Sequence, residues 1–288
     1  MSLIRQLLLS SRPFSWINTA FPFAAAYLFA VREIDWVLLL GALFFLVPYN
    51  VAMYGINDVF DYESDLRNPR KGGIEGALLH PSLHAPVLWI SVLSTVPPAL
   101  LLMLGGGPAT WVAMLVSLFA VAAYSVKGLR FKERPFLDSL TSSTHFVSPA
   151  VVGFALAHDR FGFTPGPTVM IILGAFFLWG MAAHAFGAVQ DVVPDREAGI
   201  SSVATAIGAR STVRMAVLLW AAAGALLLLG HWPTPLAALL VIPYIAISLP
   251  WFNVTDETSA AVNSSWRRFI WLNYGCGLLA TLMLFWIW

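Results

Sequence analysis

The sequence predicts an all-α membrane protein, a bundle of nine transmembrane helices with a central cavity that opens near the cytoplasmic side. Of its 288 residues, 59% are hydrophobic and 11% are charged, so the chain is more apolar and less charged than a soluble domain. The apolar residues cluster in runs of the roughly 20 residues that a bilayer-spanning helix needs. The runs do not alternate as membrane β-strands do, and lipid offers no partner to unpaired backbone groups, so helices are expected.

Nine apolar runs, separated by charged residues, proline or glycine, mark these helices in chain order. The first run follows Arg5 and Arg12, and its length and the lack of a small-residue cleavage site indicate a retained helix rather than a signal peptide. The predicted spans are Phe14 to Val31, Trp36 to Ile56, His84 to Leu104, Ala109 to Val126, Leu137 to Ala157, Thr168 to Val189, Ser211 to Gly230, Pro235 to Trp251 and Phe269 to Trp288. We interpret residues 1–288 as a single transmembrane domain.

The basic residues between the spans predict the orientation of the bundle. Fourteen of the sixteen Lys and Arg residues fall on one side of the membrane when the spans alternate in direction, and Arg32 and Arg160 fall on the other. Because basic loops stay in the cytoplasm, the N-terminus is predicted to be cytoplasmic and the C-terminus external. We therefore expect an integral protein of a prokaryotic cell membrane, surrounded by membrane lipids.

The charge balance and the cysteine count exclude several other classes of function. Sixteen basic and fifteen acidic residues give a net charge of +1, which offers no basic surface to a nucleic acid. The single cysteine, Cys276, lies in the last apolar run, so one chain forms neither a disulfide nor a cysteine-based zinc site. The oligomeric state is left open.

Acidic residues are concentrated in two short segments at predicted cytoplasmic helix ends. The first acidic segment is NDVFDYESD, from Asn57 to Asp65, and LRNPRKGG follows it. Asn50, Tyr54, Asn57, Asp61 and Asp65 are spaced by three or four residues, which places them on one helical face. Carboxylates at this spacing repel one another, so divalent cations or basic side chains are expected beside them.

The second acidic segment is DVVPDREAG, from Asp191 to Gly199, and ISSVATAIG follows it. Asp191 and Asp195 are one helical turn apart. His184 precedes Asp191 by seven residues and is expected on the same face, either as a partner of Asp191 or as a packed core histidine. Pro194 is expected to end or kink the helix near the second acid.

The loop YSVKGLRFKERP after the fourth span is basic. Such a loop is typical of a cytoplasmic anchor, which is the simpler explanation of its charges. For Lys127 and Arg130, contact with an anionic substrate is an equally good explanation. Arg67, directly after the first acidic segment, has the same two interpretations.

Two acidic segments on one side of the membrane favour a magnesium–diphosphate site. Mg²⁺ prefers oxygen ligands and is usually held by a few carboxylates together with substrate phosphates. A metal-neutralised diphosphate leaves readily, and the carbocation that it leaves behind needs a dry, apolar chamber. Twenty Phe, twelve Trp and seven Tyr residues can line such a chamber, because aromatic faces attract positive charge.

In these two segments the sequence resembles the UbiA superfamily of intramembrane aromatic prenyltransferases. Residues Asn57 to Asp65 match the family pattern N-D-x-x-D-x-x-x-D, and Asp191 to Gly199 match its second pattern, D-x-x-x-D. The resemblance implies a Mg²⁺-dependent transfer of an isoprenyl group from an allylic diphosphate to a lipophilic acceptor.

The resemblance also implies roles for individual residues. The metal ions and the diphosphate would be held by Asn57, Asp58, Asp61, Asp65, Asp191 and Asp195. The catalytic set would comprise Asp61, Asp65, Asp191, Asp195 and Lys127. Substrate contacts would come from Asn50, Tyr54, Asn57, Asp58, Arg67, Lys127, Arg130 and His184.

The residues that flank the two motifs are particularly similar to the lycopene elongase branch of that superfamily. This implies dimethylallyl diphosphate as the donor and lycopene as the acceptor, in carotenoid biosynthesis. Two alternatives stay open: an acceptor that is a quinone precursor or a chlorin, and a transporter whose acids bind a permeating cation. A transporter is expected to place its acids near the bilayer midplane, whereas here both segments lie at helix ends.

Overall fold

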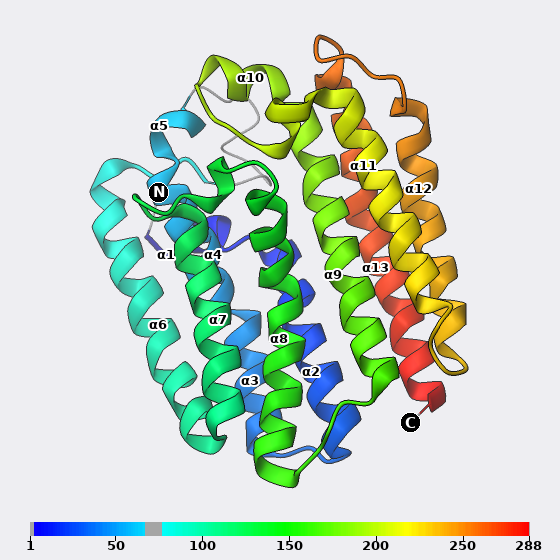
Figure 1. Ribbon diagram of the computed structural model, residues 1–288. Coiled ribbons are helices and arrows are strands. Elements are labelled where there is room, and N and C mark those ends of the chain that lie inside the picture. Colours follow the sequence, from blue (N-terminus) through cyan, green and yellow to red (C-terminus); the bar gives the residue numbers. More distant parts are fainter. Residues whose placement is uncertain (1–2, 67–76, 288) are drawn as a thin grey trace. The chain divides into compact units, whose positions relative to one another are not determined.

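The structure, a computed structural model, describes residues 3–66 and 77–287, and these residues form helices and loops without any strand (Figure 1). Within them, nine helical segments are long and apolar enough to cross a membrane, by length and composition. They are Pro13–Val31, Trp36–Phe60, Pro81–Gly105, Pro108–Ser125, Leu137–Phe161, Pro167–Glu197, Val203–Leu227, Thr234–Trp251 and Ser259–Trp286. The predicted all-α architecture with nine spans is thereby confirmed for the described part of the chain.

The chain divides into two compact units. Unit 1 comprises Met1–Phe131 and His145–Thr164, and unit 2 comprises Lys132–Thr144 and Pro165–Trp288. Helix α8 (Leu137–Phe161) contributes its first residues to unit 2 and its remainder to unit 1. Each unit contains one of the two acidic segments.

Unit 1 begins with a short helix that was not expected from the sequence. Its elements are α1 (Leu3–Ser10), η1 (Pro13–Ser15), α2 (Ile17–Val31), α3 (Trp36–Leu46), α4 (Pro48–Phe60), α5 (Tyr62–Asp65), η2 (Pro81–Leu83), α6 (His84–Gly105), α7 (Pro108–Ser125) and the start of η3 (Phe131–Glu133). The apolar side of α1 packs through Leu3 and Leu7 against a small cluster formed by Ala77, Leu79 and Val87. Only a few apolar residues of α1 face this cluster, so its apolar pattern is too short to predict a helix from the sequence.

Close helix packing builds the core of unit 1. Phe23 of α2 is fully buried and meets Phe45 of α3 with ring centroids 5.2 Å apart. A Cβ atom at Gly41 would lie 2.0 Å from the Phe23 ring, so only glycine allows this approach of α3 to α2. Small residues at such contacts are typical of helices that associate inside a membrane.

The second predicted span is broken at its middle, where Pro48 starts α4. Proline has no N–H to donate, so carbonyls at the end of α3 need other partners. The amide nitrogen of Asn50 donates to the carbonyls of Phe45 (2.8 Å) and Leu46 (3.1 Å) and to Thr19 Oγ1 (2.8 Å). Asn50 therefore stabilises the break between α3 and α4.

Two polar networks close the end of unit 1 that lies opposite α5 (Figure 1). In one, Arg160 Nη1 lies 3.0 Å from Asp35 Oδ2 and donates to the Tyr27 hydroxyl, also at 3.0 Å. In the other, Asp159 Oδ2 accepts hydrogen bonds from Thr110 N (2.8 Å) and Gly107 N (2.9 Å), which caps α7 from a distant part of the chain. These contacts tie α2, α3, α7 and α8 together.

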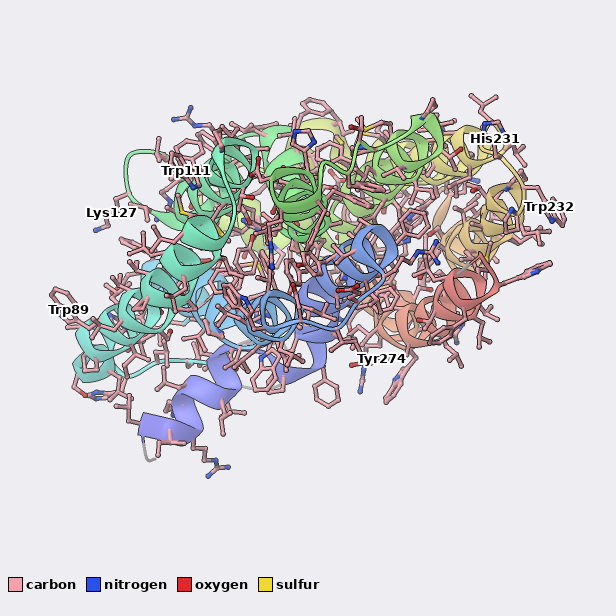
Figure 2. All side chains as sticks on the ribbon, turned by 90° about the horizontal axis from the view of Figure 1, so that it is seen from below. Trp89, Trp111, Lys127, His231, Trp232 and Tyr274 are labelled. Atoms are coloured by element: carbon pink, nitrogen blue, oxygen red, sulfur yellow. The ribbon has the colours of Figure 1, made fainter. Side chains whose placement is uncertain are left out.

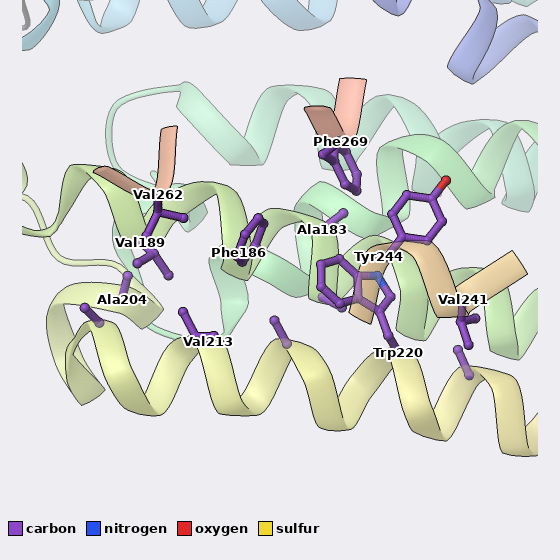
Figure 3. Close-up of a cluster of buried hydrophobic side chains, with 14 of the residues drawn as sticks. Ala183, Phe186, Val189, Ala204, Val213, Trp220, Val241, Tyr244, Val262 and Phe269 are labelled. Atoms are coloured by element: carbon purple, nitrogen blue, oxygen red, sulfur yellow. The ribbon is translucent and has the colours of Figure 1, made fainter. Parts of the chain in front are cut away.

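Unit 2 is organised around the long helices α9 and α11. Its elements are α9 (Pro167–Ala188), η4 (Val189–Asp191), α10 (Val192–Glu197), α11 (Val203–Leu227), η5 (Thr234–Val241), α12 (Ile242–Ser248), η6 (Leu249–Trp251), η7 (Ser259–Val262) and α13 (Asn263–Ile287). Figure 3 shows the core, in which the fully buried Trp220 stacks on Tyr244 with ring centroids 5.7 Å apart. Phe186 and Phe269 pack against the same indole.

Large apolar side chains also cover the outside of the molecule. Trp89, Trp232 and Tyr274 project away from the ribbon in Figure 2. Helix α13 exposes Trp271 and Phe285 in the same way. Such a surface is unfavourable in water and suited to lipid, so the structure agrees with an integral membrane protein.

The start of α11 differs from the prediction, which places the start of the seventh span at Ser211. The helix begins eight residues earlier because Ser202 and Thr205 form a reciprocal capping box, with Thr205 N donating to Ser202 Oγ and Ser202 N donating to Thr205 Oγ1. Gly208 then interrupts the helix with non-helical backbone angles, φ 80° and ψ 161°. The polar, glycine-containing sequence therefore belongs to a kinked helix rather than to a loop.

Candidate active site

Three carboxylates of the first acidic segment lie buried where α4 meets α5. Asp58, Asp61 and Asp65 are 1%, 7% and 6% exposed. Asp61 caps the C-terminus of α4, and the Asp65 amide donates to the Asp61 carbonyl at 2.8 Å, so the helical turn continues into α5. Asn57 Nδ2 donates to Asp61 Oδ2 at 2.8 Å, as expected for side chains one turn apart.

The end of α7 and the turn after it hold Asp61 in place. Ser125 Oγ donates to Asn57 Oδ1 at 3.2 Å, which orients the amide that binds Asp61. Arg130 has a left-handed backbone (φ 40°), and its Nη2 lies 3.8 Å from Asp61 Oδ1. Its Nη1 donates to the carbonyl of Phe60 at 3.5 Å. The structure therefore brings Arg130, one of the two candidate cations, to the first acidic segment.

A different set of donors engages Asp58. Ser10 Oγ donates to Asp58 Oδ2 at 2.9 Å and the Ala77 amide donates to the same oxygen at 3.2 Å, while Arg12 Nη2 lies 3.3 Å from Oδ1. The Arg12 guanidinium also lies 4.4 Å from the centroid of the Tyr54 ring, in a cation–π contact. Protein groups thus occupy both oxygens of Asp58.

Arg12 is a site residue that the sequence places only beside the first span. Its guanidinium interacts electrostatically with Asp65 as well as with Asp58. A basic residue directly before a proline that starts a new helix was a visible signal of a chain turn. Its acidic partner lies 46 residues away, which no local pattern reveals.

Several predicted site residues are not gathered with these acids. Asn50 uses its amide nitrogen to stabilise the break between α3 and α4. Lys127 is exposed and points away from the molecule in Figure 2. Arg67 lies outside the described residues. These three assignments stay predictions.

The second acidic segment begins at a break in the helix that Pro194 requires. The proline ring of residue i clashes with the carbonyl of residue i−4 in a continuous helix, which here is Gln190. The chain accordingly forms the 3₁₀ turn η4 and restarts as α10, with Pro194 in its first turn. Gln190 Oε1 accepts a hydrogen bond from Asn263 Nδ2 at 2.6 Å, which ties the residue before Asp191 to the start of α13.

A glycine ends α10 shortly after Asp195. Gly199 has φ 71°, the Ile200 amide donates to the Asp195 carbonyl at 2.8 Å, and the Gly199 amide donates to the Arg196 carbonyl at 3.1 Å. This pair of bonds is a Schellman motif, which uses a left-handed residue after the helix. The helix that presents Asp195 therefore has only six residues.

His184 is placed beside the start of α8. Its Nδ1 lies 3.1 Å from Ser139 Oγ, and the buried carboxylate of Asp138 interacts with it electrostatically. Asp138 Oδ1 accepts the Ser139 amide and its Oδ2 accepts the Val203 amide, both at 2.7 Å, so Asp138 also caps α11. Asp138 does not stand out in the sequence, because a lone acid at a helix start resembles an ordinary cap.

The donor set of the two acidic segments is chemically suited to Mg²⁺, since it consists of carboxylate and amide oxygens. Within residues 3–66 and 77–287, no three acidic, histidine or cysteine side chains converge closely enough to hold a metal ion by themselves. Mg²⁺ usually takes one or two carboxylates and completes its shell with water and substrate phosphates. An open set of acids fits that mode of binding.

Comparison with known proteins agrees with this arrangement. The model of the UbiA prenyltransferase family matches residues 19–273. A protein from Corynebacterium glutamicum named lycopene elongase/hydratase is 51% identical over 99% of this chain and 98% of its own length. A protein of the same name from Haloarcula japonica is 31% identical over 99% of this chain and 93% of its own.

The fold has a match among solved structures as well. The structure of a UbiA homologue from Archaeoglobus fulgidus, solved with DMAPP and Mg²⁺, superposes with a TM-score of 0.65 over 94% of this chain and 98% of its own, at 18% identity. The family model spans both units of the chain and both acidic segments. The chain therefore belongs to the UbiA prenyltransferase family.

Proposed function

We propose that this protein transfers a dimethylallyl group from its diphosphate to the terminal double bonds of lycopene. The observation that supports this most is the 51% identity over nearly the full length of both chains to the Corynebacterium glutamicum protein named lycopene elongase/hydratase. Both acidic segments are present, and the described carboxylates of the first are buried at a helix end. Each unit supplies one acidic segment to the proposed reaction, so we infer that the two units act as a single catalytic domain.

In the proposed assignment, Asp61, Asp65, Asp191 and Asp195 hold the Mg²⁺ ions of the donor. Bound Mg²⁺ would neutralise the diphosphate and make it a better leaving group. Asn57 orients Asp61 through its hydrogen bond, and Arg130 provides positive charge beside the same carboxylate. We assign Asp58 to structure rather than to metal, because Ser10, Arg12 and the Ala77 amide already bind it.

The chemical steps follow from the donor and the acceptor. The bond between the allylic carbon and the diphosphate oxygen breaks, and both electrons leave with the diphosphate. The terminal double bond of lycopene then supplies the two electrons of the new carbon–carbon bond, which leaves a tertiary cation on the former acceptor. This cation either loses a proton to a base or captures water, which then loses a proton.

We propose that both acidic segments face the cytoplasm, with the N-terminus on the same side and the C-terminus outside. The proposal is supported by the distribution of Lys and Arg, because basic loops are retained in the cytoplasm. Alkaline phosphatase fused after Trp288 should be active in this orientation. Activity only when the enzyme is fused to the loop before α6 would reverse it.

The function is tested in membranes that contain the protein, with Mg²⁺, dimethylallyl diphosphate and lycopene. Wild type should produce carotenoids heavier by one or two five-carbon units, and the mass also shows whether water is added. Asp61→Asn should lower the rate by about a hundredfold or more, as expected when a group that stabilises developing charge is lost. Glu63→Gln, an exposed carboxylate of α5, is the matched control and should keep the rate.

The outcomes of this assay separate the alternatives. Turnover of the donor with a quinone precursor or a chlorin, and none with lycopene, would replace the acceptor. If no acceptor is prenylated, a membrane transporter that binds a cation becomes the better explanation.

A further inference from the structure

The kink in α11 interrupts the backbone hydrogen-bond pattern of the helix. In an unbroken helix the amide of Ala209 would donate to the carbonyl of Thr205, four residues earlier. At Gly208 the backbone is non-helical, and the Ala209 amide donates instead to Asp256 Oδ1 at 2.7 Å. The Thr205 carbonyl accepts from Arg196 Nη2 at 2.9 Å and from Nε at 3.3 Å.

Arg196 and Asp256 therefore each satisfy one half of the broken bond, and they also bind each other through Arg196 Nη1 and Asp256 Oδ2. We call this set the latch: Arg196, Thr205, Gly208, Ala209 and Asp256. A Cβ atom at Gly208 would lie 3.3 Å from Asp256 Oδ1, so glycine permits both the kink and the close approach of the carboxylate. Three segments meet here: α10, α11 and the loop between η6 and η7.

The latch acts on a helix that needs an external anchor. Helix α10 has only six residues, and helices much shorter than about 12 residues are marginal without tertiary contacts. Arg196 follows Asp195 directly, so fixing the Arg196 side chain restricts the helix that presents Asp195. On the other side of Asp191, the bond between Gln190 and Asn263 provides a second anchor.

We propose that the latch positions Asp195 for the diphosphate-bound metal, with Arg196 and Asp256 as positioning residues that do not touch the substrate. This inference rests on the proposed function for the role of Asp195. The physical basis is preorganisation: a carboxylate held in its binding geometry loses less entropy when the metal and the donor arrive. The sequence around Asp256 contains no motif that would assign it such a role.

The first test measures the latch without relying on activity, by hydrogen–deuterium exchange of the purified full chain in detergent or nanodiscs. Asp256→Asn keeps an acceptor for the Ala209 amide but loses the charge that binds Arg196, and Asp256→Ala loses both. Exchange of the backbone amides of residues 192, 193 and 195–198 should therefore quicken from wild type to Asn to Ala. Equal exchange in all three proteins would overturn the latch.

A matched control residue of α11 binds the same loop. Arg214 Nε donates to the carbonyl of Phe252 (3.3 Å) and Nη2 donates to Asn253 Oδ1 (3.0 Å), so Arg214 anchors that loop without an observed contact to α10. Arg214→Ala should leave the exchange of α10 unchanged. If it quickens α10 as much as Asp256→Ala does, general loosening of the loop explains the effect and the latch is rejected.

The second test measures positioning through kinetics. Asp256→Asn should raise the Mg²⁺ concentration for half-maximal rate and the KM of the donor by about threefold, the size expected for a partly exposed ion pair. Its kcat at saturating Mg²⁺ should change less, and Arg196→Lys should be intermediate because it keeps the charge but loses the fork geometry. Unchanged Mg²⁺ and donor dependence, with quickened exchange, would make the latch structural only and overturn the positioning role. An inactive wild type would instead reject the proposed function, while the exchange data would still decide whether the latch exists.

Discussion

The two acidic segments are held in different ways. In the first, the carboxylates themselves are bound: Asn57 and Arg130 contact Asp61, and Arg12 contacts Asp58, all at the end of α4. In the second, the residues directly beside the acids have long-range partners, since Asn263 binds Gln190 and Asp256 binds Arg196. Its acids sit on a turn and a six-residue helix and are half-buried. The first segment is thus fixed at its buried carboxylates, and the second is also anchored through the residues on either side of its acids.

This difference predicts that a single substitution damages the first segment more severely. Arg12→Leu leaves the fully buried carboxylate of Asp58 without its cation, and breaking such a pair costs several kcal/mol. Because the Arg12 side chain is 22% exposed, we expect a loss near the low end of that range, about 2–3 kcal/mol. Thermal unfolding in detergent measures it. The double variant Arg12→Leu/Asp58→Asn should recover much of the loss, and a single variant as stable as wild type would contradict the direct mode of holding.

Replacing a glycine with left-handed backbone in the second segment should reduce stability less than Arg12→Leu does. Gly199 has φ 71°, and a Cβ atom at this position would meet no other part of the chain within 4 Å. Gly199→Ala therefore causes no clash, and only its left-handed backbone is penalised. We expect a loss of roughly 1–2 kcal/mol and faster hydrogen exchange in α10. Gly275→Ala, also in open space but inside α13, should be neutral or stabilising. Equal effects of the two substitutions would argue against the Schellman motif.

The pH dependence of stability distinguishes the indirect anchor of the second segment. The pKa of Asp256 is lower than its ordinary value of 3.8. The hydrogen bond from the Ala209 amide lowers this pKa most, and the bond from Arg196 lowers it further. Partial burial of the carboxyl acts in the opposite direction but is outweighed. A carboxyl whose pKa is lower in the folded protein stabilises the fold above that ordinary value, and this stabilisation is lost as the pH falls through the folded pKa. Wild type should therefore unfold at a higher temperature than Asp256→Asn at pH 7, and the difference should shrink below about pH 4. If the two unfolding temperatures differ by the same amount at pH 7 and pH 3, the charge of Asp256 does not stabilise the fold.

The smallest effect on catalysis is expected for Lys127, an exposed cation after α7. The Lys127 side chain is exposed and points away from the protein, so Lys127→Ala should change kcat/KM for the donor by no more than about twofold. Arg130→Ala should lower it by about tenfold, because Arg130 lies beside Asp61. Steady-state rates with dimethylallyl diphosphate measure both. The opposite ranking would restore the catalytic role that the resemblance implied for Lys127.

Local patterns in the chain were sufficient to predict much of this protein. The predicted features depend on residues that are close in the sequence. They are the nine apolar runs of spanning length, the helical spacing of Asn57, Asp61 and Asp65, and the helix break that Pro194 requires. Lipid reinforces these signals, because a spanning segment must satisfy its own backbone groups and therefore has to be helical. The same local logic failed at residues 203–210, where a polar run with a glycine is a kinked helix rather than a loop.

Contacts between distant residues decided the rest. Arg12 meets Asp58 across 46 positions, Asp138 caps Val203 across 65, and Arg196 meets Asp256 across 60. Asn50 fits the polar face of its helix in the sequence, yet the fold uses it to satisfy the carbonyls of Phe45 and Leu46 at the end of α3. A sequence pattern records which side chains share a helix face, but it does not record which buried donor will find which acceptor. That pairing is set only when the helices pack, because burial makes each unpaired polar group costly and forces it to find a partner.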